Sequence, residues 1–406
     1  MLNAVELITL RQEFPVLNQQ VNDHPLIYLD NAATSQKPNV VLEAINTYYR
    51  DINANVHRAS HALSSQATLA YEKARQTCAQ FINASNNKEI IWTRGTTEAI
   101  NLLANGLTQQ FQAGDEIIIS TAEHHANIVP WQMLAQRTGA IIKVIPLLDN
   151  CDLDMAAYQA LLSDKTKLVA VNHVSNALGT VNPIADIIAL AKQVNAKVFI
   201  DGAQAIAHWS VDVQALGCDF YAFSGHKMYG PTGIGVLWGR QAELEAMPPW
   251  QGGGEMIKTV TFAETTYNEL PFKFEAGTPN IAGAISLAAA MDFLTQQDRL
   301  ALARHEDELL SYTCEQLAKI DRVKIIGNPN QRAGAVSFII EDAHNADVGT
   351  LLDMQGIAVR TGHHCAQPLM HSLNIPGTIR ISPAIYNSQA EIDFTLQALE
   401  ALMDLL

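Results

Sequence analysis

A lysine in a glycine-rich segment is the strongest chemical signal in this sequence of 406 residues. The segment runs from Ser224 to Gly235 and follows an apolar run that predicts a strand. Lys227 in such a turn could bind a phosphate or form an imine with a carbonyl compound. The Walker phosphate-binding pattern needs Ser or Thr after its lysine, whereas Met228 follows Lys227. No Gly-x-Gly-x-x-Gly pattern follows a predicted strand, so an imine-forming lysine is favoured.

Two other groups near predicted strand ends have complementary chemistry. Asp201 ends the apolar run 198–200, where a carboxylate is costly unless a cationic group meets it. Thr96 and Thr97 follow Gly95 at a predicted helix start, where hydroxyls and free N–H groups suit a phosphate. An ordinary helix N-cap is the alternative for these threonines.

These pieces together match the needs of pyridoxal phosphate. That cofactor requires a lysine for its imine, an acid to keep the pyridinium nitrogen protonated, and a phosphate cup. Lys227 and Asp201 supply the first two, and the predicted cup is formed by Thr96, Thr97, Ser224 and His226. All of them lie at the carboxyl ends of predicted parallel strands, where ligands of such sheets bind.

A histidine pair follows another predicted strand. Adjacent residues point in different directions, so His124 and His125 are a poor chelating pair. His124 is a candidate to stack on the cofactor ring or to act as an acid or base. A polar loop without catalytic function is the alternative.

Cys365 differs from the other cysteines. Cys78 and Cys314 lie in amphipathic helical patterns, Cys218 precedes a strand and Cys151 lies in a turn. Cys365 lies in a loop, 360–368, bounded by Gly and Pro and containing two histidines and an arginine. Such surroundings favour the nucleophilic thiolate. A small residue without chemical function is the alternative.

Zinc binding and substrate binding are two further hypotheses for the same region. His363, His364 and Cys365 could bind zinc, but three contiguous ligands are awkward around a tetrahedral ion. Arg380 lies inside a short apolar strand. It could clamp the carboxylate of an amino-acid substrate or form an internal ion pair.

Strands alternate with helices through the middle of the chain, which predicts βαβ units and a mostly parallel sheet. The predicted strands are 89–93, 116–120, 141–145, 167–172, 197–201, 220–224 and 233–238. The predicted helices between them are 97–110, 127–138, 154–162 and 183–194. We therefore expect an α/β fold with a seven-stranded, mostly parallel sheet.

A second, smaller α+β unit is predicted after about residue 284. Its predicted elements are a helical region 284–320 broken near Gln297, strands 322–326, 335–340, 357–360 and 378–381, and helices 346–355 and 389–406. A helix near 5–14 is expected to pack on this unit. The resulting division is an N-terminal segment 1–25, a large cofactor-binding domain 26–284 and a small domain 285–406.

Composition restricts the class of protein. The net charge of −15 disfavours nucleic acid and anionic membranes as partners. Five scattered cysteines favour a reducing compartment, and no signal peptide or membrane span is recognised. A cytoplasmic protein is expected.

The motifs resemble those of the class V, fold-type I pyridoxal phosphate enzymes, in particular the group II (Suf-type) cysteine desulfurases and selenocysteine lyases. The resemblance covers essentially the whole chain, through the segments 28–33, 94–98, 123–127, 201–204, 224–227, 274–280 and 360–368. Group I desulfurases differ in carrying their cysteine in a longer, Ser-rich loop.

The resemblance implies a role for each matching residue. Lys227 would carry the cofactor, and Asp201 would pair with the pyridine nitrogen. Asn176 and Gln204 would contact the phenolic oxygen side of the ring, and His124 would stack on it. Thr96, Ser224 and His226 would bind the phosphate, and Thr278 would reach the phosphate of a second subunit in a homodimer. Arg380 with Asn176 would hold the substrate carboxylate, with Arg360 near the cysteine loop. His57 and Arg58 would fall near the site without a firm role.

The implied reaction removes sulfur from L-cysteine, giving L-alanine and a persulfide on Cys365. The sulfur would pass to a SufE-like acceptor for iron–sulfur cluster assembly. L-selenocysteine is a second expected substrate. Gln367 is shared with the Csd-type branch, so the Suf-type and Csd-type pathways both stay open. The same scaffold also suits a dedicated selenocysteine lyase, an aminotransferase or a kynureninase-like hydrolase, and a metal-binding protein is a more remote hypothesis.

Overall fold

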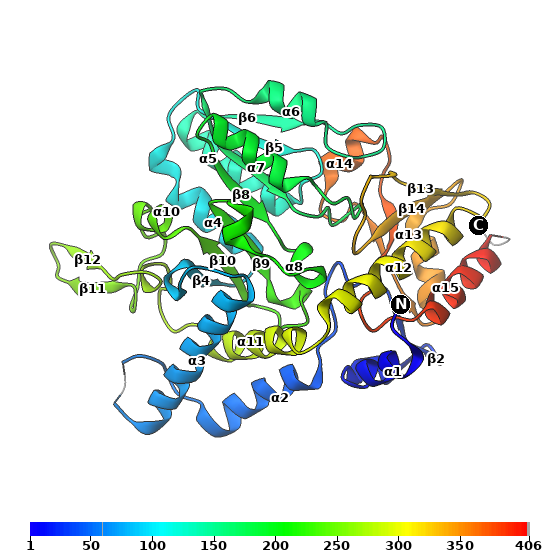
Figure 1. Ribbon diagram of the computed structural model, residues 1–406, viewed down its shortest axis with the longest axis horizontal. Helices are drawn as coiled ribbons and strands as arrows, with labels where there is room; N and C mark the ends of the chain where they lie inside the picture. Colours follow the sequence, from blue (N-terminus) through cyan, green and yellow to red (C-terminus); the bar gives the residue numbers. More distant parts are fainter. Residues whose placement is uncertain (59, 404–406) are drawn as a thin grey trace.

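A seven-stranded sheet forms the larger part of the protein (Figure 1). The computed structural model describes residues 1–58 and 60–403. Across the sheet the order is β4 (Ile90–Thr93), β10 (Gly235–Gly239), β9 (Phe220–Ser224), β8 (Lys197–Asp201), β7 (Thr166–Asn172), β5 (Glu116–Ser120) and β6 (Ile141–Ile145). β10 runs antiparallel to both its neighbours, β4 and β9, and the other pairs of strands in this sheet are parallel. The predicted α/β fold and mostly parallel sheet are confirmed.

Helices cover both faces of this sheet because successive side chains of each strand point to opposite faces. Leu168 and Ala170 of β7 pack on one face, while Val169 and Val171 pack on the other. The first face is covered by α4 (Thr96–Gly106), α5 (Val129–Thr138) and α10 (Gln241–Ala246). The second is covered by α3 (Ala62–Phe81), α7 (Ile184–Gln193) and α11 (Ile281–Thr295). Such two-sided burial fixes the register of the strands and hence the positions of the residues at their ends.

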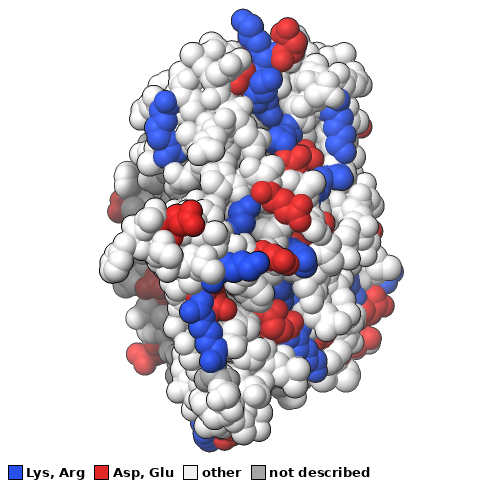
Figure 2. Space-filling model, turned by 90° about the vertical axis from the view of Figure 1, so that its left-hand side faces the viewer, with Lys and Arg blue, Asp and Glu red and all other residues white. Residues whose placement is uncertain are grey.

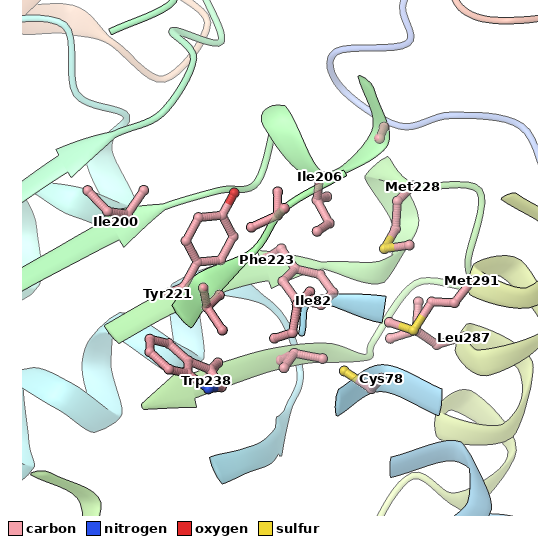
Figure 3. Packing of buried hydrophobic residues seen from close by; sticks show 14 of the residues in the cluster. Cys78, Ile82, Ile200, Ile206, Tyr221, Phe223, Met228, Trp238, Leu287 and Met291 are labelled. Atoms are coloured by element: carbon pink, nitrogen blue, oxygen red, sulfur yellow. The ribbon is translucent and has the colours of Figure 1, made fainter. Parts of the chain in front are cut away.

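Figure 3 shows the core on the second face. Phe223 of β9 lies in a cluster that includes Cys78 of α3 and Leu287 and Met291 of α11, and Tyr221 of the same strand belongs to that cluster. All five side chains are fully buried. Cys78, which the sequence places in an amphipathic helical pattern, is a buried residue of α3.

The smaller unit contains a four-stranded sheet (Figure 1). Its order is β13 (Val323–Ile325), β14 (Val336–Ile340), β17 (Thr378–Ile381) and β16 (Arg360–Gly362). A separate hydrophobic cluster joins this sheet to its helices. These are α12 (Arg299–Leu317), α13 (Asn345–Asp353) and α15 (Gln389–Leu402). The short helix α14 (Gln367–Ser372) follows the Cys365 loop.

The long predicted helix 284–320 is two helices, as expected from the break near Gln297. Asp298 accepts a hydrogen bond from the backbone N–H of Ala301 and so begins α12. The prediction of one strand over 357–360 is wrong in its extent. Ile357–Ala358 (β15) pairs in parallel with β3 (Ile27–Tyr28), whereas β16 pairs with β17. The end of the last predicted helix, 404–406, lies outside the described residues.

The N-terminal helix α1 (Ala4–Gln12) begins at Asn3, which forms a capping box with Glu6. Arg11 of this helix pairs with Glu391 of α15 at 2.9 Å. The predicted helix 154–162 is present as α6 (Met155–Leu161).

Several further elements were not predicted from the sequence. They are β1 (Gln20–Val21), β2 (His24–Pro25), α2 (Asn39–Thr47), α8 (Ala205–His208), α9 (Val213–Leu216), β11 (Ile257–Val260) and β12 (Thr265–Tyr267). The hairpin β11–β12 projects from the large unit at the left of Figure 1.

On the face drawn in Figure 2, basic and acidic side chains are interspersed. This face therefore carries no continuous basic surface of the kind that binds nucleic acid. None of the described helices is long and apolar enough to cross a membrane.

Candidate active site

A cavity of about 410 Å³ lies at the carboxyl ends of β7, β8 and β9, where polar residues of the two units meet. It is lined by the residues that the sequence predicts to form a site, except Thr278. These are Thr96, Thr97, His124, Asn176, Asp201, Gln204, Ser224, His226, Lys227, Arg360, Cys365 and Arg380.

Lys227 and Asp201 lie at the base of this cavity. Lys227 ends the short 3-10 helix that follows β9, and Asp201 is the last residue of β8. Burial lowers the pKa of Lys227 to about 8, and the charge of Asp201 opposes that shift. Burial raises the pKa of Asp201, while the N–H of Ala203 and the charge of Lys227 lower it. Burial therefore raises the share of Lys227 present as free amine, the form that attacks a carbonyl, above that of an ordinary lysine.

The start of α4 and the end of β9 form a polar cup. The backbone N–H and the hydroxyl of Thr96 each lie 2.9 Å from the Ser224 hydroxyl. Gly95, just before the helix, has φ +152°, a conformation that favours glycine. A helix N-terminus with hydroxyls and free N–H groups attracts an anion.

His124 presents a neutral ring to the cavity. Its Nδ1 accepts the N–H of Ala126 at 3.0 Å, so in the neutral ring the proton lies on Nε2. Burial, with the positive charge of Lys227, lowers the pKa of His124 to about 3. Nearby, Gln204 donates to the carbonyl oxygen of Ala32 at 2.8 Å.

Arg380 forms the internal ion pair that is one of the two interpretations left open by the sequence. It is buried in β17, and its Nη2 donates to Oδ1 of Asp30 at 3.0 Å, which is an internal ion pair. Its Nη1 donates to the carbonyl oxygen of Asn176 at 2.6 Å. Its Nε is buried and has no hydrogen-bond partner among the described residues. Arg360 also donates to Asp30, through Nε and Nη2. Burial lowers the pKa of Arg380 to about 10, so the guanidinium stays charged at neutral pH.

The Cys365 loop lines the cavity through residues 360–365. Cys365 is exposed, and the backbone carbonyl oxygen of the preceding His364 accepts from Nδ2 of Asn176 at 2.7 Å. Nε2 of His364 lies 2.7 Å from the Thr378 hydroxyl. The loop is thus tied to both units, and the thiol and the Lys227 amine open into one cavity.

Some functional candidates lie elsewhere or were missed. Thr278 lines a separate cavity of about 630 Å³ on the large unit. His57 pairs with Glu72 at 3.0 Å and does not line the cavity of Lys227. Sequence reasoning assigned no role to Asp30 or His125, although both lie in quoted motifs. Asp30 is marked out by its contacts with the two arginines, and His125 by its contacts with the Cys365 loop. The sequence does not show these contacts, because they form only in the tertiary structure.

The cavity suits pyridoxal phosphate by the chemistry of its donors. An amine of depressed pKa, a buried carboxylate and a hydroxyl-lined helix N-terminus match its carbonyl, ring nitrogen and phosphate. The alternative of a metal site finds no support, because no group of three His, Cys, Asp or Glu residues in the described part of the chain could hold an ion.

Comparisons with known proteins agree with this geometry. The family model "Aminotransferase class-V" matches residues 27–394. A probable cysteine desulfurase of Vibrio cholerae serotype O1 is 52% identical over 404 residues, covering 99% of this chain and 100% of the relative.

Two solved structures extend the comparison. The cysteine desulfurase CsdA (S-sulfonic acid) of Escherichia coli superposes with a TM-score of 0.92 at 41% identity, covering 100% of both chains. A mutant of C-DES has glycine covalently linked to its pyridoxal phosphate cofactor. It superposes with a TM-score of 0.83 at 26% identity, covering 96% of this chain and 98% of that one. By its family model, its sequence relatives and its fold, this chain belongs to the class V aminotransferase family.

Proposed function

We propose that this protein is a pyridoxal phosphate-dependent cysteine desulfurase that moves the sulfur of L-cysteine onto Cys365 and releases L-alanine. One observation carries the proposal: the exposed Cys365 thiol and the buried Lys227 amine open into the same cavity. Transamination needs the amine but no thiol. Relatives whose sequences are 51–52% identical to this chain over nearly its full length are named cysteine desulfurase or probable cysteine desulfurase.

The residues of the cavity divide into holding and reacting groups. Thr96, Thr97, Ser224 and His226 would bind the phosphate, Asp201 the ring nitrogen, and Asn176, Gln204 and His124 the ring. The bound cofactor supplies an electron sink that makes the substrate Cα–H acidic. Lys227, as the free amine, takes that proton on Nζ. Arg380 and Asn176 orient the substrate carboxylate, and Arg360 lies beside the loop.

The sulfur step uses Cys365. Its Sγ forms a bond to the substrate sulfur as the substrate Cβ–S bond breaks. The electron pair of that bond stays with the carbon, which gains a proton and becomes the methyl group of L-alanine. The thiol of Cys365 becomes a persulfide, so no external oxidant or reductant is needed.

Replacing Cys365 tests the proposal. Cys365→Ala should abolish persulfide formation from L-cysteine while the protein still binds pyridoxal phosphate, because the cofactor contacts lie on other elements. Cys314→Ala is the matched control, since Cys314 lies in α12 and does not line the cavity. Peptide mass mapping after L-cysteine addition and an alanine assay give the readout. Undiminished sulfur release by Cys365→Ala would reject the proposed role of Cys365.

We also propose that L-selenocysteine is a substrate. A carbon–selenium bond breaks more easily than a carbon–sulfur bond, so this reaction should depend less on Cys365. Cys365→Ala should therefore retain more activity with L-selenocysteine than with L-cysteine. Equal loss with both substrates would contradict this expectation.

The proposed assembly is a homodimer that passes its sulfur to a SufE-like acceptor for iron–sulfur cluster assembly. Thr278 would then reach the phosphate of the second subunit, a role that suits its place in a cavity apart from Lys227. We propose a cytoplasmic location, in which five free cysteines would stay reduced.

We propose the same three parts of the chain as above, 1–25, 26–284 and 285–406, although α11 (Ile281–Thr295) crosses the second boundary and packs on the large sheet. Contacts of the N-terminal segment support it. The N–H of Leu2 donates to Nδ1 of His305, and Arg11 pairs with Glu391, so this segment contacts helices of the smaller unit.

A further inference from the structure

His125 contacts the Cys365 loop at two points. Its backbone N–H donates to the carbonyl oxygen of Cys365 at 2.7 Å. Its ring Nε2 accepts the backbone N–H of Gln367 at 3.0 Å. His125 directly follows His124, whose ring faces the cavity. A single turn of chain after β5 therefore contacts both the cavity and the loop that carries the thiol.

A second imidazole supports the same loop. Nδ1 of His363 accepts the backbone N–H of Cys365 at 3.0 Å. The rings of His125 and His363 lie with their centroids 5.6 Å apart and their planes 36° apart. Two neighbouring rings thus accept the N–H groups on either side of Ala366.

The loop backbone needs such support. His364 has φ +52° and Cys365 has φ +55°, two consecutive residues other than glycine in the left-handed region. Residues with a Cβ adopt this region at a cost and stay there only where surrounding contacts hold them. The bonds from His125, His363 and Asn176, with that between His364 and Thr378, are among the contacts that hold this stretch.

The contact from Gln367 depends on the protonation state of His125. An imidazole nitrogen accepts a hydrogen bond only when it carries no proton, so the ring must be neutral. Burial, with the nearby His363, lowers the pKa of His125, which favours that state at neutral pH. The titratable rings that face it are those of His124 and His363, with centroids 6.3 Å and 5.6 Å from that of His125.

We propose that His125 is a positioning residue for sulfur transfer, whose neutral ring braces the Cys365 loop through Gln367 and releases it when the ring is protonated. This inference rests on the proposed desulfurase function. Because Gln367 begins α14, the brace fixes the start of that helix and the placement of Cys365 two residues earlier.

Hydrogen exchange of the holoenzyme, with fragmentation that resolves the Gln367 amide, tests the brace. His125→Phe keeps a ring but removes the acceptor, and should lower the protection of this amide about three- to tenfold. His125→Gln places an amide oxygen near the position of Nε2 and should restore protection. The matched control is His371→Phe, an exposed histidine at the other end of α14.

The pH dependence separates the brace from a merely structural role. In the wild type, protection of the Gln367 amide should fall as the pH drops from 8 to 5, after correction for intrinsic exchange. In His125→Gln it should stay level, because an amide does not titrate in this range. A wild-type protection that is independent of pH would overturn the proposed release. The comparison of wild type with His125→Gln still tests the proposal if His125→Phe does not fold.

Kinetics connect the brace to chemistry. His125→Phe should slow persulfide formation on Cys365 and leave the KM for L-cysteine unchanged, because Arg380 remains in place. A variant that exchanges faster at Gln367 but forms persulfide at the wild-type rate would overturn the positioning role. If the wild type itself forms no persulfide, the proposed function fails, whereas the exchange results still decide whether the brace exists.

Discussion

At the scale of single residues, burying the Lys227 amine lowers the stability of the folded protein. Its pKa of about 8 lies below the ordinary value of 10.5 because its ammonium form is buried. A basic group whose pKa is lowered by burial of its charged form destabilises the folded state at every pH where the unfolded chain carries the proton. The penalty is full below pH 8 and disappears as the pH rises toward 10.5. Asp201 reduces this penalty but does not remove it.

Lys227→Met should therefore stabilise the protein when pyridoxal phosphate is absent. We expect about 1–3 kcal/mol at pH 7, because an apolar side chain of similar length avoids the burial of charge. The measurement is the thermal midpoint of cofactor-free wild type and variant from pH 7 to pH 10. The difference should shrink as the pH rises. A variant that is less stable than the wild type at pH 7 would contradict the assignment of a buried, poorly solvated amine.

Arg380 provides a second test at this scale. Its unpartnered Nε and its place in the cavity suit a carboxylate ligand. Arg380→Ala should raise the KM for L-cysteine about tenfold to a hundredfold, the range for a lost charge-assisted hydrogen bond. Arg50→Ala, which removes an exposed arginine, is the control. An unchanged KM in Arg380→Ala would mean that the ion pair with Asp30 is its whole role.

At the scale of elements, β10 supports the cup formed by Gly95, Thr96 and Ser224. It is the antiparallel strand between β4 and β9, and a Cβ at Gly235 would lie 2.5 Å from Cα of Gly95. Gly235→Ala must therefore displace the start of α4. We expect weaker binding of pyridoxal phosphate, by about tenfold or more.

Titration of cofactor-free Gly235→Ala with pyridoxal phosphate measures this effect. Gly252→Ala is the matched control, because a Cβ there would meet no atom within 4 Å. Equal affinity in the two variants would show that the cup does not depend on the close approach of β10.

The strands of the large sheet could be predicted closely because their signal is local. Runs of β-branched and aromatic residues gave β5, β6, β8 and β9 at their observed bounds. The bounds of helix α3 were not predicted, although Cys78 was placed in a helical pattern, because many of its buried positions are small or polar, among them Ser64, Ala67 and Arg75. The two-residue pairing of β3 with β15 joins segments about 330 residues apart, and short strands carry no periodic signal.

In the candidate site, too, features with a local sequence signal were predicted and those that depend on tertiary contacts were not. Residues at strand ends were predictable because parallel strands bring their carboxyl ends to one edge. Asp30 and His125 were not assigned, because their roles depend on Arg380 and Gln367, which reach them only through the tertiary structure.

At the scale of the whole molecule, the proposed homodimer makes each site depend on two chains. A heterodimer of Lys227→Ala and Thr278→Ala chains, isolated with two different tags, contains one site with both its own Lys227 and the partner's Thr278 intact. It should have about half the activity of the wild type. Both parent homodimers should be less active than this heterodimer. A heterodimer no more active than Thr278→Ala would show that Thr278 serves its own chain or no site.

The central claim is that sulfur passes from L-cysteine to Cys365 in a site with Lys227 at its base. The most direct measurement is a single turnover of the holoenzyme with sulfur-34-labelled L-cysteine, followed by quenching and mass analysis. The account predicts that the label appears on the Cys365 peptide at the same rate and in the same amount as L-alanine. Alanine formed without label on Cys365, or label on another cysteine, would contradict it.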